Sequence, residues 1–503
     1  MTVAAIDLGA ESGRVATVDF DGTKLHLDVA HRFTHSPVIA DGVLRWDLNT
    51  LWDEVQAGLH LLDAGDTPIA SLGVDTWGVD YGLLDSDGTL VDAPTCYRDP
   101  RNVRAMKHAI DKIGAETLYN ATGVQLIAIN TIFSLLADLR ERPGRLTSAT
   151  RLLMMPDVFH HLLSGSTSTE YTVASTSGLF DMQSGRWSET LLTRLGLPFD
   201  LMPEVLPPGT DIGPLLGNYT GSLRDCRVIL PAAHDTASAV VGTPLSDPTA
   251  MFISSGTWSL AGVETANAVV TEGSRHANLT NEGGYGGTIR LLRNVMGLWI
   301  LQNCRRQWAK EGLNLTYAEV ADLAEQEPGL ESVINPDDED FLAPGDMPRR
   351  IQDYCQRMVI PIPQTVGAIA RCVIDSLALS YRDVAEALTE VTGIAPRTIN
   401  IVGGGASHAL LSQLTADATG LPVRCGPVEA TALGNAAVQL AALGELGGLA
   451  DIRKIVAASA DLVDYQPCGG YDWDSAASQL ARLGAHDPVD SAPANASSDP
   501  PDT

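Results

Sequence analysis

The stretch DLGAESGR, residues 7–14, separates two β-rich runs, Val3 to Leu8 and Val15 to Phe20. Two short strands joined by a turn of small residues form a hairpin, so we expect one at the start of the chain. Asp7 would lie at the end of the first strand, where a carboxylate can hold a hydrated Mg²⁺. The planar, positively charged guanidinium of Arg14 can bind phosphate oxygens. The glycines let backbone N–H groups approach phosphate oxygens. An ordinary hairpin is the alternative, because the spacings of a Walker loop and of a dinucleotide fingerprint are both absent.

A second unit of the same kind lies halfway along the chain. Met251 to Ser254 and Trp258 to Val263 are short β-rich runs, and the turn Ser255-Gly256-Thr257 joins them. The hydroxyls and the glycine of this turn are suited to gripping a terminal phosphate from the opposite side, although a plain tight turn would look the same. The repeat suggests an internal duplication, with chance as the alternative because glycine turns between strands are common.

The length and the order of elements indicate two α/β domains. A chain of 503 residues is too long for one hydrophobic core. Strand-like and helix-like segments alternate throughout, which is typical of α/β layers. Because GTPLSDP at residues 242–248 resembles a loop, we predict an N-terminal domain over residues 1–243 and a C-terminal domain over residues 244–465. Residues 485–503 are rich in Pro, Ser, Ala and Asp, and we expect them to form a disordered tail.

The composition excludes several classes of partner. A formal net charge of −29 argues against nucleic-acid or anionic-membrane binding, which needs a basic surface. If the substrate is a polyanion, its charge must be neutralised locally. The seven cysteines are scattered without CxxC spacing, and the N-terminus lacks the features of a secretory signal. No apolar stretch is long enough to predict a membrane helix, so we expect a cytoplasmic protein with free thiols.

Two further motifs have the chemistry of a nucleotide site and of a proton acceptor. Residues 403–405 are three glycines between the apolar run Thr398 to Val402 and a helix-like segment, Ala409 to Thr419, and they offer a flat backbone face to a purine. Asp235, in the triplet HDT, is either the N-cap of the next helix or a catalytic base. We expect the helix N-terminus to lower the pKa of Asp235, which phosphoryl transfer tolerates because the hydroxyl proton can leave late.

The stretch GVDTWGVDYG, residues 73–82, has the composition of a sugar-binding platform. Trp77 and Tyr81 would offer aromatic faces to sugar C–H groups, and Asp75 and Asp80 would accept hydrogen bonds from hydroxyls. The alternative is a core strand in which Trp77 is merely packed.

Eight sequence blocks, taken in order, resemble the FGGY family of carbohydrate kinases, which includes glycerol kinase, xylulokinase and rhamnulokinase. The resemblance covers roughly residues 1–465 and is most specific for the rhamnulokinase branch. It implies two ribonuclease-H-like domains of the actin and hexokinase type, with ATP and sugar in the cleft between them. The blocks are HRF (31–33), GVDTWGVDYGLLD (73–85), YRD (97–99), HDTASAV (234–240), SSGTWSL (254–260), NEGG (281–284), RNVMGLWILQ (293–302) and GPVEATALGN (426–435).

The resemblance also implies which residues form the site. Asp235 would be the proton acceptor. Apart from the resemblance, Asp7 is our candidate for positioning the metal, through water. The ATP-binding residues would be Ala10, Glu11, Ser12, Gly13, Arg14, Thr257, Gln302 and Gly404. The sugar-binding residues would be Gly78, His234, Asp235, Thr236 and Asn294.

This chain departs from the family pattern at two places. Glu11 stands where a small residue is common, and because an acidic side chain facing phosphates would be unfavourable, we expect it to point away. Thr415 and Thr419 stand where some members have a cysteine pair, so no disulfide is available there.

By resemblance, the activity would be ATP-dependent phosphorylation of L-rhamnulose to L-rhamnulose 1-phosphate in L-rhamnose catabolism, with Mg²⁺ as the metal. The partners would be L-rhamnulose and ATP, without nucleic acid or membrane, and the protein would be a monomer or a homodimer. One alternative is a kinase of the same family that acts on xylulose, fuculose or a polyol. Another is a non-catalytic sugar or nucleotide sensor on the same fold. Because both Asp7 and Asp235 are present, the sensor is the weaker alternative.

Overall fold

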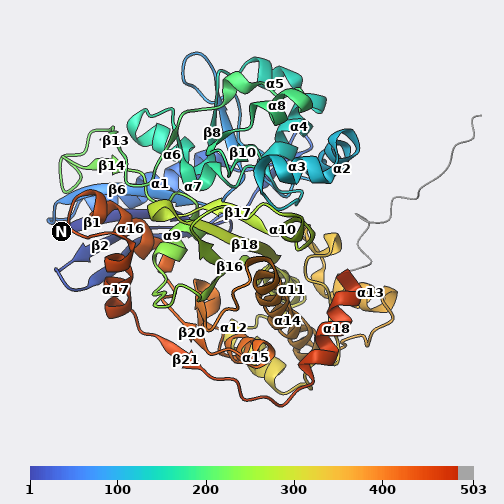
Figure 1. Ribbon diagram of the computed structural model, residues 1–503. Coiled ribbons are helices and arrows are strands. Elements are labelled where there is room, and N and C mark those ends of the chain that lie inside the picture. Colours follow the sequence, from blue (N-terminus) through green and yellow to red (C-terminus); the bar gives the residue numbers. More distant parts are fainter. Residues whose placement is uncertain (485–503) are drawn as a thin grey trace, which may run out of the picture.

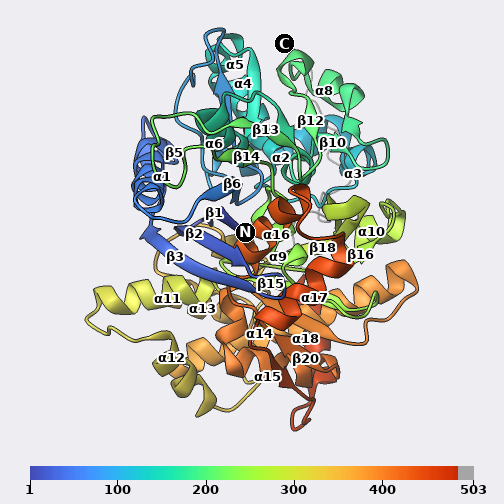
Figure 2. The ribbon, with the colours of Figure 1, turned by 90° about the vertical axis from the view of Figure 1, so that its left-hand side faces the viewer.

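The computed structural model describes residues 1–484, so the predicted tail lies outside the described residues. Two large β-sheets form the centres of two lobes (Figures 1 and 2). The N-terminal sheet has the order β13-β14-β6-β1-β2-β3, with bounds Asp211–Pro214, Arg227–Ile229, Ile69–Thr76, Thr2–Leu8, Ser12–Phe20 and Leu25–Thr34. The C-terminal sheet has the order β17-β18-β16-β15-β19-β20-β21, with bounds Thr280–Gly283, Ile289–Met296, Trp258–Thr265, Met251–Ser255, Ile399–Val402, Val423–Cys425 and Val463–Tyr465.

The two sheets repeat one arrangement of strands. In each, a hairpin pairs with a third antiparallel strand on one side and with two parallel strands on the other. The hairpins are β1–β2 and β15–β16, so both predicted hairpins are confirmed. Every residue of β1 is buried, as expected for a central strand covered on both faces.

A lobe of short elements is inserted between β6 and β13. It contains β7, which pairs with β8 in a small separate sheet, and several helices that lie above the N-terminal sheet in Figure 1. Its elements are β7 (Tyr81–Leu84), α2 (Arg101–Ile113), α3 (Ala115–Thr122), α4 (Thr131–Glu141), α5 (Pro143–Thr147), β8 (Arg151–Met154), α6 (Met155–Ser164), β9 (Thr169–Glu170), α7 (Tyr171–Ala174), β10 (Phe180–Asp181), β11 (Arg186–Trp187), α8 (Glu189–Leu195) and β12 (Val205–Leu206).

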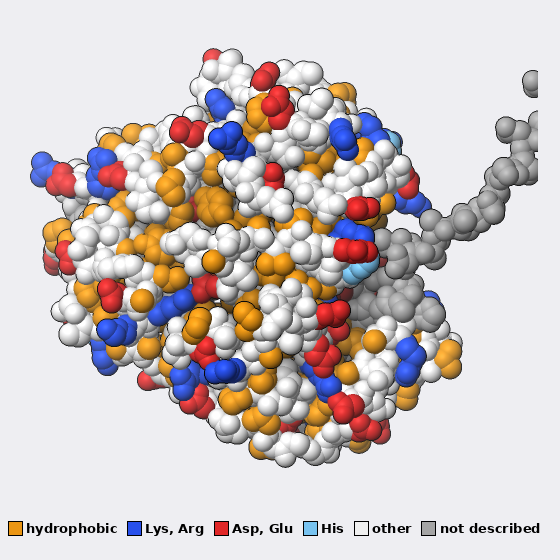
Figure 3. Space-filling model, in the orientation of Figure 1, with side chains coloured by type: hydrophobic (Ala, Val, Ile, Leu, Met, Phe, Trp, Pro, Cys, Tyr) orange, Lys and Arg blue, Asp and Glu red, His pale blue; other side chains and the backbone are white. Residues whose placement is uncertain are grey.

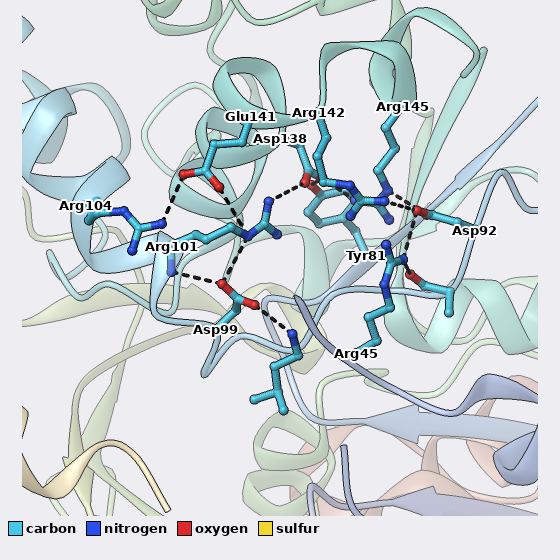
Figure 4. A network of polar contacts seen from close by, with 12 residues as sticks. Arg45, Tyr81, Asp92, Asp99, Arg101, Arg104, Asp138, Glu141, Arg142 and Arg145 are labelled. Atoms are coloured by element: carbon cyan, nitrogen blue, oxygen red, sulfur yellow. Dashed lines mark hydrogen bonds and ion pairs between the residues drawn. The ribbon is translucent and has the colours of Figure 1, made fainter. Parts of the chain in front are cut away.

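A buried network of charges joins the helices of this inserted lobe (Figure 4). Asp138 is fully buried and accepts hydrogen bonds from Tyr81 Oη at 2.7 Å, from Arg101 at 3.2 Å and from Arg145. Because buried charges are tolerated only when paired, these contacts hold the helices in one arrangement. They also show that the prediction of a sugar contact for Tyr81 is wrong, since its hydroxyl points away from the cleft into this network.

Helices of the C-terminal lobe pack around the 27-residue helix α14, Val366–Thr392, which is buried along most of its length. The predicted helix Ala409–Thr419 is confirmed as α15. No helix within residues 1–484 combines the length and the apolar composition needed to cross a bilayer. The other helices of this part are α10 (Glu272–His276), α11 (Trp299–Lys310), α12 (Tyr317–Glu325), α13 (Met347–Arg357), α17 (Leu449–Ser459) and α18 (Trp473–Gly484).

Two helices lie between the sheets and cross at glycines (Figure 2). They are α9, Asp235–Val241, and α16, Ala430–Ala442. A Cβ on Gly434 would lie 1.8 Å from the carbonyl oxygen of Ser238, so the two backbones touch. Although α16 comes late in the sequence, it packs on the N-terminal sheet, where Gln439 Nε2 donates to the carbonyl of Ala4 at 2.9 Å. The C-terminal part of the chain therefore helps to hold the N-terminal lobe in place.

The face seen in Figure 3 carries acidic and basic side chains interspersed.

Candidate active site

A cleft of about 500 Å³ lies between the two sheets, where the turns of the two hairpins face each other. Every residue predicted for the site lines it except Gly13. A Cβ on Gly13 would lie 2.3 Å from the ring of Phe33, so this glycine serves close packing inside the hairpin. The predicted residues that line the cleft are Asp7, Ala10, Glu11, Ser12, Arg14, Gly78, His234, Asp235, Thr236, Thr257, Asn294, Gln302 and Gly404.

The glycine loop at 403–405 packs against the turn of the second hairpin. A Cβ on Gly405 would lie 2.0 Å from Ser255 Oγ, and one on Gly403 would lie 2.9 Å from the carbonyl oxygen of Ser255. Gly404 has no atom within 4 Å of such a position, so its face is open. The loop thus offers the cleft a bare backbone surface beside the turn that holds Thr257, as a purine next to phosphates would need.

Arg14 is held between two carboxylates. Its Nε lies 3.3 Å from Asp7 Oδ2, and its Nη1 forms an ion pair with Glu429. Arg32 also donates to Glu429, at 2.8 Å. Sequence reasoning missed both Arg32 and Glu429 as site residues, although each stands in a block that carries the family resemblance, HRF and GPVEATALGN. The cation predicted for phosphate binding therefore has a competing anion within the cleft.

Glu11 also has a partner across the cleft. Its carboxylate accepts a hydrogen bond from Arg306 of α11 at 2.6 Å. This ion pair offsets the negative charge that made Glu11 unfavourable beside phosphates. Its orientation relative to bound phosphates stays a prediction.

Three carboxylates, those of Asp7, Asp75 and Asp235, lie near enough to one another at the base of the cleft for their charges to interact. Asp7 and Asp75 are register partners on the parallel strands β1 and β6, so their side chains share one face of the sheet. Burial raises the pKa of Asp7 and raises that of Asp75 well above its ordinary value, and the charge of Asp7 adds to the second effect. Asp75 accepts a hydrogen bond from Asn435 of α16 at 2.5 Å. Asp7 Oδ2 and Asp75 Oδ1 are buried and receive no hydrogen bond within residues 1–484.

Asp235 is the first residue of α9, and its carboxylate accepts a hydrogen bond from Thr236 N at 2.6 Å. The expected lowering of its pKa is wrong, because burial raises it and the charge of Asp7 adds to the rise, while His234 opposes it. The carboxylate lies deep among protein atoms even though 28% of the side-chain surface faces the cleft. Desolvation therefore outweighs the helix dipole.

His234 stands between Asp235 and a buried ion pair. Its Nε2 lies 3.3 Å from Asp235 Oδ1, and its Nδ1 lies 3.2 Å from Arg290 Nη2. Arg290 in turn lies 3.2 Å from Glu282, a residue of the NEGG block that sequence reasoning did not single out. The same Nδ1 lies 3.4 Å from Glu282 Oε2, so the ring of His234 stands between two carboxylates, Asp235 and Glu282.

The predicted sugar platform is only partly present. Trp77 is packed against Trp46 with ring centroids 4.2 Å apart, and both indoles donate to Asp80. Trp77 and Asp80 are thus packed in the core, as the alternative interpretation held, although Trp77 also borders the cleft. A Cβ on Gly78 would lie 3.2 Å from His234 Nε2, so this glycine keeps the space beside His234 clear.

Comparison with known proteins extends the family resemblance to nearly the whole chain. The profile of the N-terminal domain of the FGGY family of carbohydrate kinases matches residues 2–242, and that of the C-terminal domain matches residues 251–443. A rhamnulokinase from Bacteroides thetaiotaomicron is 39% identical over 475 residues, which cover 94% of this chain and 97% of the relative. A rhamnulokinase from Pectobacterium carotovorum is 41% identical over 467 residues, with coverage of 92% and 93%.

Solved structures share the fold at much lower identity. The xylulose kinase from Lactobacillus acidophilus matches with a TM-score of 0.76 at 19% identity, over 96% of both chains. The glycerol kinase from Plasmodium falciparum, solved with ADP, matches with a TM-score of 0.74 at 14% identity, over 96% of this chain and 97% of its own. These matches confirm the predicted two-domain α/β fold, and together with the sequence matches they establish that the chain belongs to the FGGY family of carbohydrate kinases.

Proposed function

We propose that the protein transfers the γ-phosphate of ATP to O1 of L-rhamnulose, giving L-rhamnulose 1-phosphate and ADP in L-rhamnose catabolism. Membership of the family makes it an ATP-dependent sugar kinase, and the choice of sugar rests on relatives named rhamnulokinase at about 40% identity. The observation that supports this chemistry most directly is the position of Asp235. Its carboxylate is partly exposed to the cleft, between the two hairpin turns that we propose bind the phosphates.

Asp235 is the proposed proton acceptor. It would hold the O1 hydroxyl in line with the γ-phosphate and take its proton as the oxygen–phosphorus bond forms. A carboxylate with a raised pKa is a stronger base than a free one, provided that it is ionised at the working pH. His234 Nε2 lies 3.3 Å from the same carboxylate, and a hydrogen on that nitrogen would help to keep the carboxylate charged.

The phosphates would lie between the two turns. Arg14, Thr257 and the backbone N–H groups of residues 10–13 would stabilise the charge that develops on the transferred group. Glu429 has to give up its contact with Arg14 when the phosphates arrive. Gln302 and Gly404 would contact the nucleotide, and Gln302 Oε1 is a buried acceptor on the cleft wall without a hydrogen bond in the described part of the chain.

The residues present fit a Mg²⁺ ion that is shared with the nucleotide. Mg²⁺ in such sites takes one or two protein carboxylates and completes its shell with water and phosphate oxygens. Asp7, which lines the cleft, and the adjacent Asp75, whose buried Oδ1 has no hydrogen bond, would supply that donor set, whereas residues 1–484 hold no cluster of three ligands that would bind a metal by itself. When bound, the ion would neutralise phosphate charge.

A panel of sugars with an ADP-coupled readout tests the proposal. We expect L-rhamnulose to be strongly preferred over xylulose, fuculose and glycerol. Preference for another ketose or polyol would replace the substrate but keep the kinase. Sugar binding without turnover in MgATP would instead support a sensor. The domain boundary near 243, a cytoplasmic location and a monomeric or homodimeric state remain predictions.

A further inference from the structure

The segment 123–130 connects α3 to α4 in the N-terminal half, but it is bound to the C-terminal sheet. The carbonyl of Gly123 accepts hydrogen bonds from Asn281 N at 2.9 Å and from Asn281 Nδ2 at 2.8 Å. Leu126 N donates to Asn278 Oδ1 at 3.1 Å. The segment therefore bridges the two lobes along one wall of the cleft, next to strands β17 and β18.

Gln125, at the centre of this segment, is bonded to Asn294 of β18. Gln125 is 4% exposed, and its Oε1 accepts from both the backbone N and the side-chain Nδ2 of Asn294, each at 2.9 Å. A backbone N–H can only donate, so the atom of Gln125 that faces it must be the oxygen. The atom of Asn294 that faces the same oxygen must then be its nitrogen. Both amide orientations are thus determined by the geometry.

The contacts of Asn294 leave its oxygen free. Its backbone N and its side-chain Nδ2 both donate to Gln125 Oε1, so the side-chain nitrogen is turned toward Gln125. Asn294 Oδ1 has no hydrogen bond within residues 1–484, and Asn294 lines the cleft.

We propose that Gln125 is a positioning residue for sugar recognition, which fixes Asn294 as an acceptor for a sugar hydroxyl and links that recognition to the contact between the lobes. The proposal rests on the proposed sugar-kinase function and deepens it. Without Gln125, the amide of Asn294 could rotate and present its nitrogen, which a hydroxyl oxygen would meet in a different geometry. The site would then lose a preformed acceptor rather than a catalytic group.

The test compares Gln125→Met with wild type in steady-state kinetics. Methionine keeps the length of the side chain but cannot accept these bonds well. We expect the KM for L-rhamnulose to rise about 10- to 100-fold, the KM for ATP to stay within about twofold and kcat to stay within about threefold, the pattern of lost uniform binding. Gln125→Asn, whose acceptor is retracted by one carbon, gives a second variant with the same expected split.

Two controls separate positioning from a structural role. Asn278→Gly removes the Asn278 contact to the same segment without touching Asn294, and we expect its KM for the sugar to stay within about threefold of wild type. In an Asn294→Ala background, Gln125→Met should change the KM for the sugar less than about twofold, because the residue it positions is gone. An equal effect in both backgrounds, or KM values for ATP and sugar that rise together, would overturn the proposal.

Failure of this proposal can be told apart from failure of the proposed function. If wild type prefers another sugar, the assignment of L-rhamnulose fails, and the effects of Gln125→Met on the KM for sugar and the KM for ATP are then compared with the preferred sugar.

Discussion

Replacing Gly434 by alanine tests whether the crossing of α9 and α16 positions the proposed base. The added Cβ would lie 1.8 Å from the carbonyl oxygen of Ser238 and 2.8 Å from the backbone nitrogen of Gly242. Van der Waals contact needs roughly 3.5 Å, so the helices would have to separate by roughly 1.5 Å. The clashing atoms are backbone atoms and cannot swing aside as a flexible side chain would.

The expected cost follows from this geometry. Overpacking of a core contact costs about 1–3 kcal/mol, and a rigid backbone clash belongs at the upper end. For domains of this size, about 3 kcal/mol corresponds to a decrease in Tm of about 6–12 °C. Because α9 begins at Asp235, its displacement should also lower kcat at least tenfold, since a shift of about 1 Å in a reacting group can cost 10²-fold.

Thermal unfolding and steady-state kinetics of Gly434→Ala measure both effects. Gly144→Ala is the matched control, because Gly144 lies in helix α5 with no atom within 4 Å of an added Cβ. The control should keep its kcat and should melt at the same temperature as wild type or slightly above, since alanine restricts the unfolded chain. A Gly434→Ala protein that melts within about 1 °C of wild type with unchanged kcat would refute the reasoning.

Three further changes test the charges of the site and its supports. Asp235→Asn should lower kcat by about 10²- to 10⁴-fold with little change in the KM for ATP. Near-full activity of this variant would show that Asp235 is not the proton acceptor. In wild type, the acidic limb of kcat/KM should lie above pH 3.8, because burial raises the pKa of Asp235. Glu429→Gln should tighten ATP binding about fivefold in calorimetry, since Arg14 and Arg32 no longer pair with a competing anion; weaker binding would contradict this. Asp80→Asn tests how protonation of Asp80 is coupled to folding. Burial raises the pKa of Asp80 to about 7, so the folded state retains a proton that the unfolded state releases near pH 4. The wild-type free energy of unfolding should therefore fall between pH 4 and 7 by on the order of 4 kcal/mol from this group, and urea denaturation of Asp80→Asn at pH 5 and 8 should show a smaller difference.

Local features of the sequence predicted the strands and helices that carry the site. The hairpins at β1–β2 and β15–β16 follow from small turn residues between β-rich runs, and α15 follows a glycine loop after a buried strand. These signals act over a few residues, so a single sequence contains them. The family resemblance then placed the separate pieces around one cleft.

Contacts between distant residues were not predictable in the same way. The partner of Tyr81 is Asp138, 57 residues later, and nothing near Tyr81 distinguishes a sugar contact from a buried hydrogen bond. Arg32 and Glu429 are 397 residues apart, and Gln125 and Asn294 are 169 apart. The prediction of a lowered pKa for Asp235 was wrong for the same reason, because the helix dipole is a local effect whereas burial depends on the whole fold.

Pairing of charges across the cleft explains how a strongly acidic protein can hold a polyanion. The net charge is −29, so its overall field repels ATP, and the attraction must come from a few cations inside the cleft. The cations at the cleft already have carboxylate partners: Arg14 and Arg32 contact Glu429, and Arg306 contacts Glu11. Glu429 stabilises the largely buried Arg14, which would otherwise be desolvated without a partner, and phosphate oxygens can replace this carboxylate with little change in local charge. Binding would then be an exchange of anions around fixed cations, and the carboxylates that are displaced, Glu429 first, would set the affinity for the nucleotide.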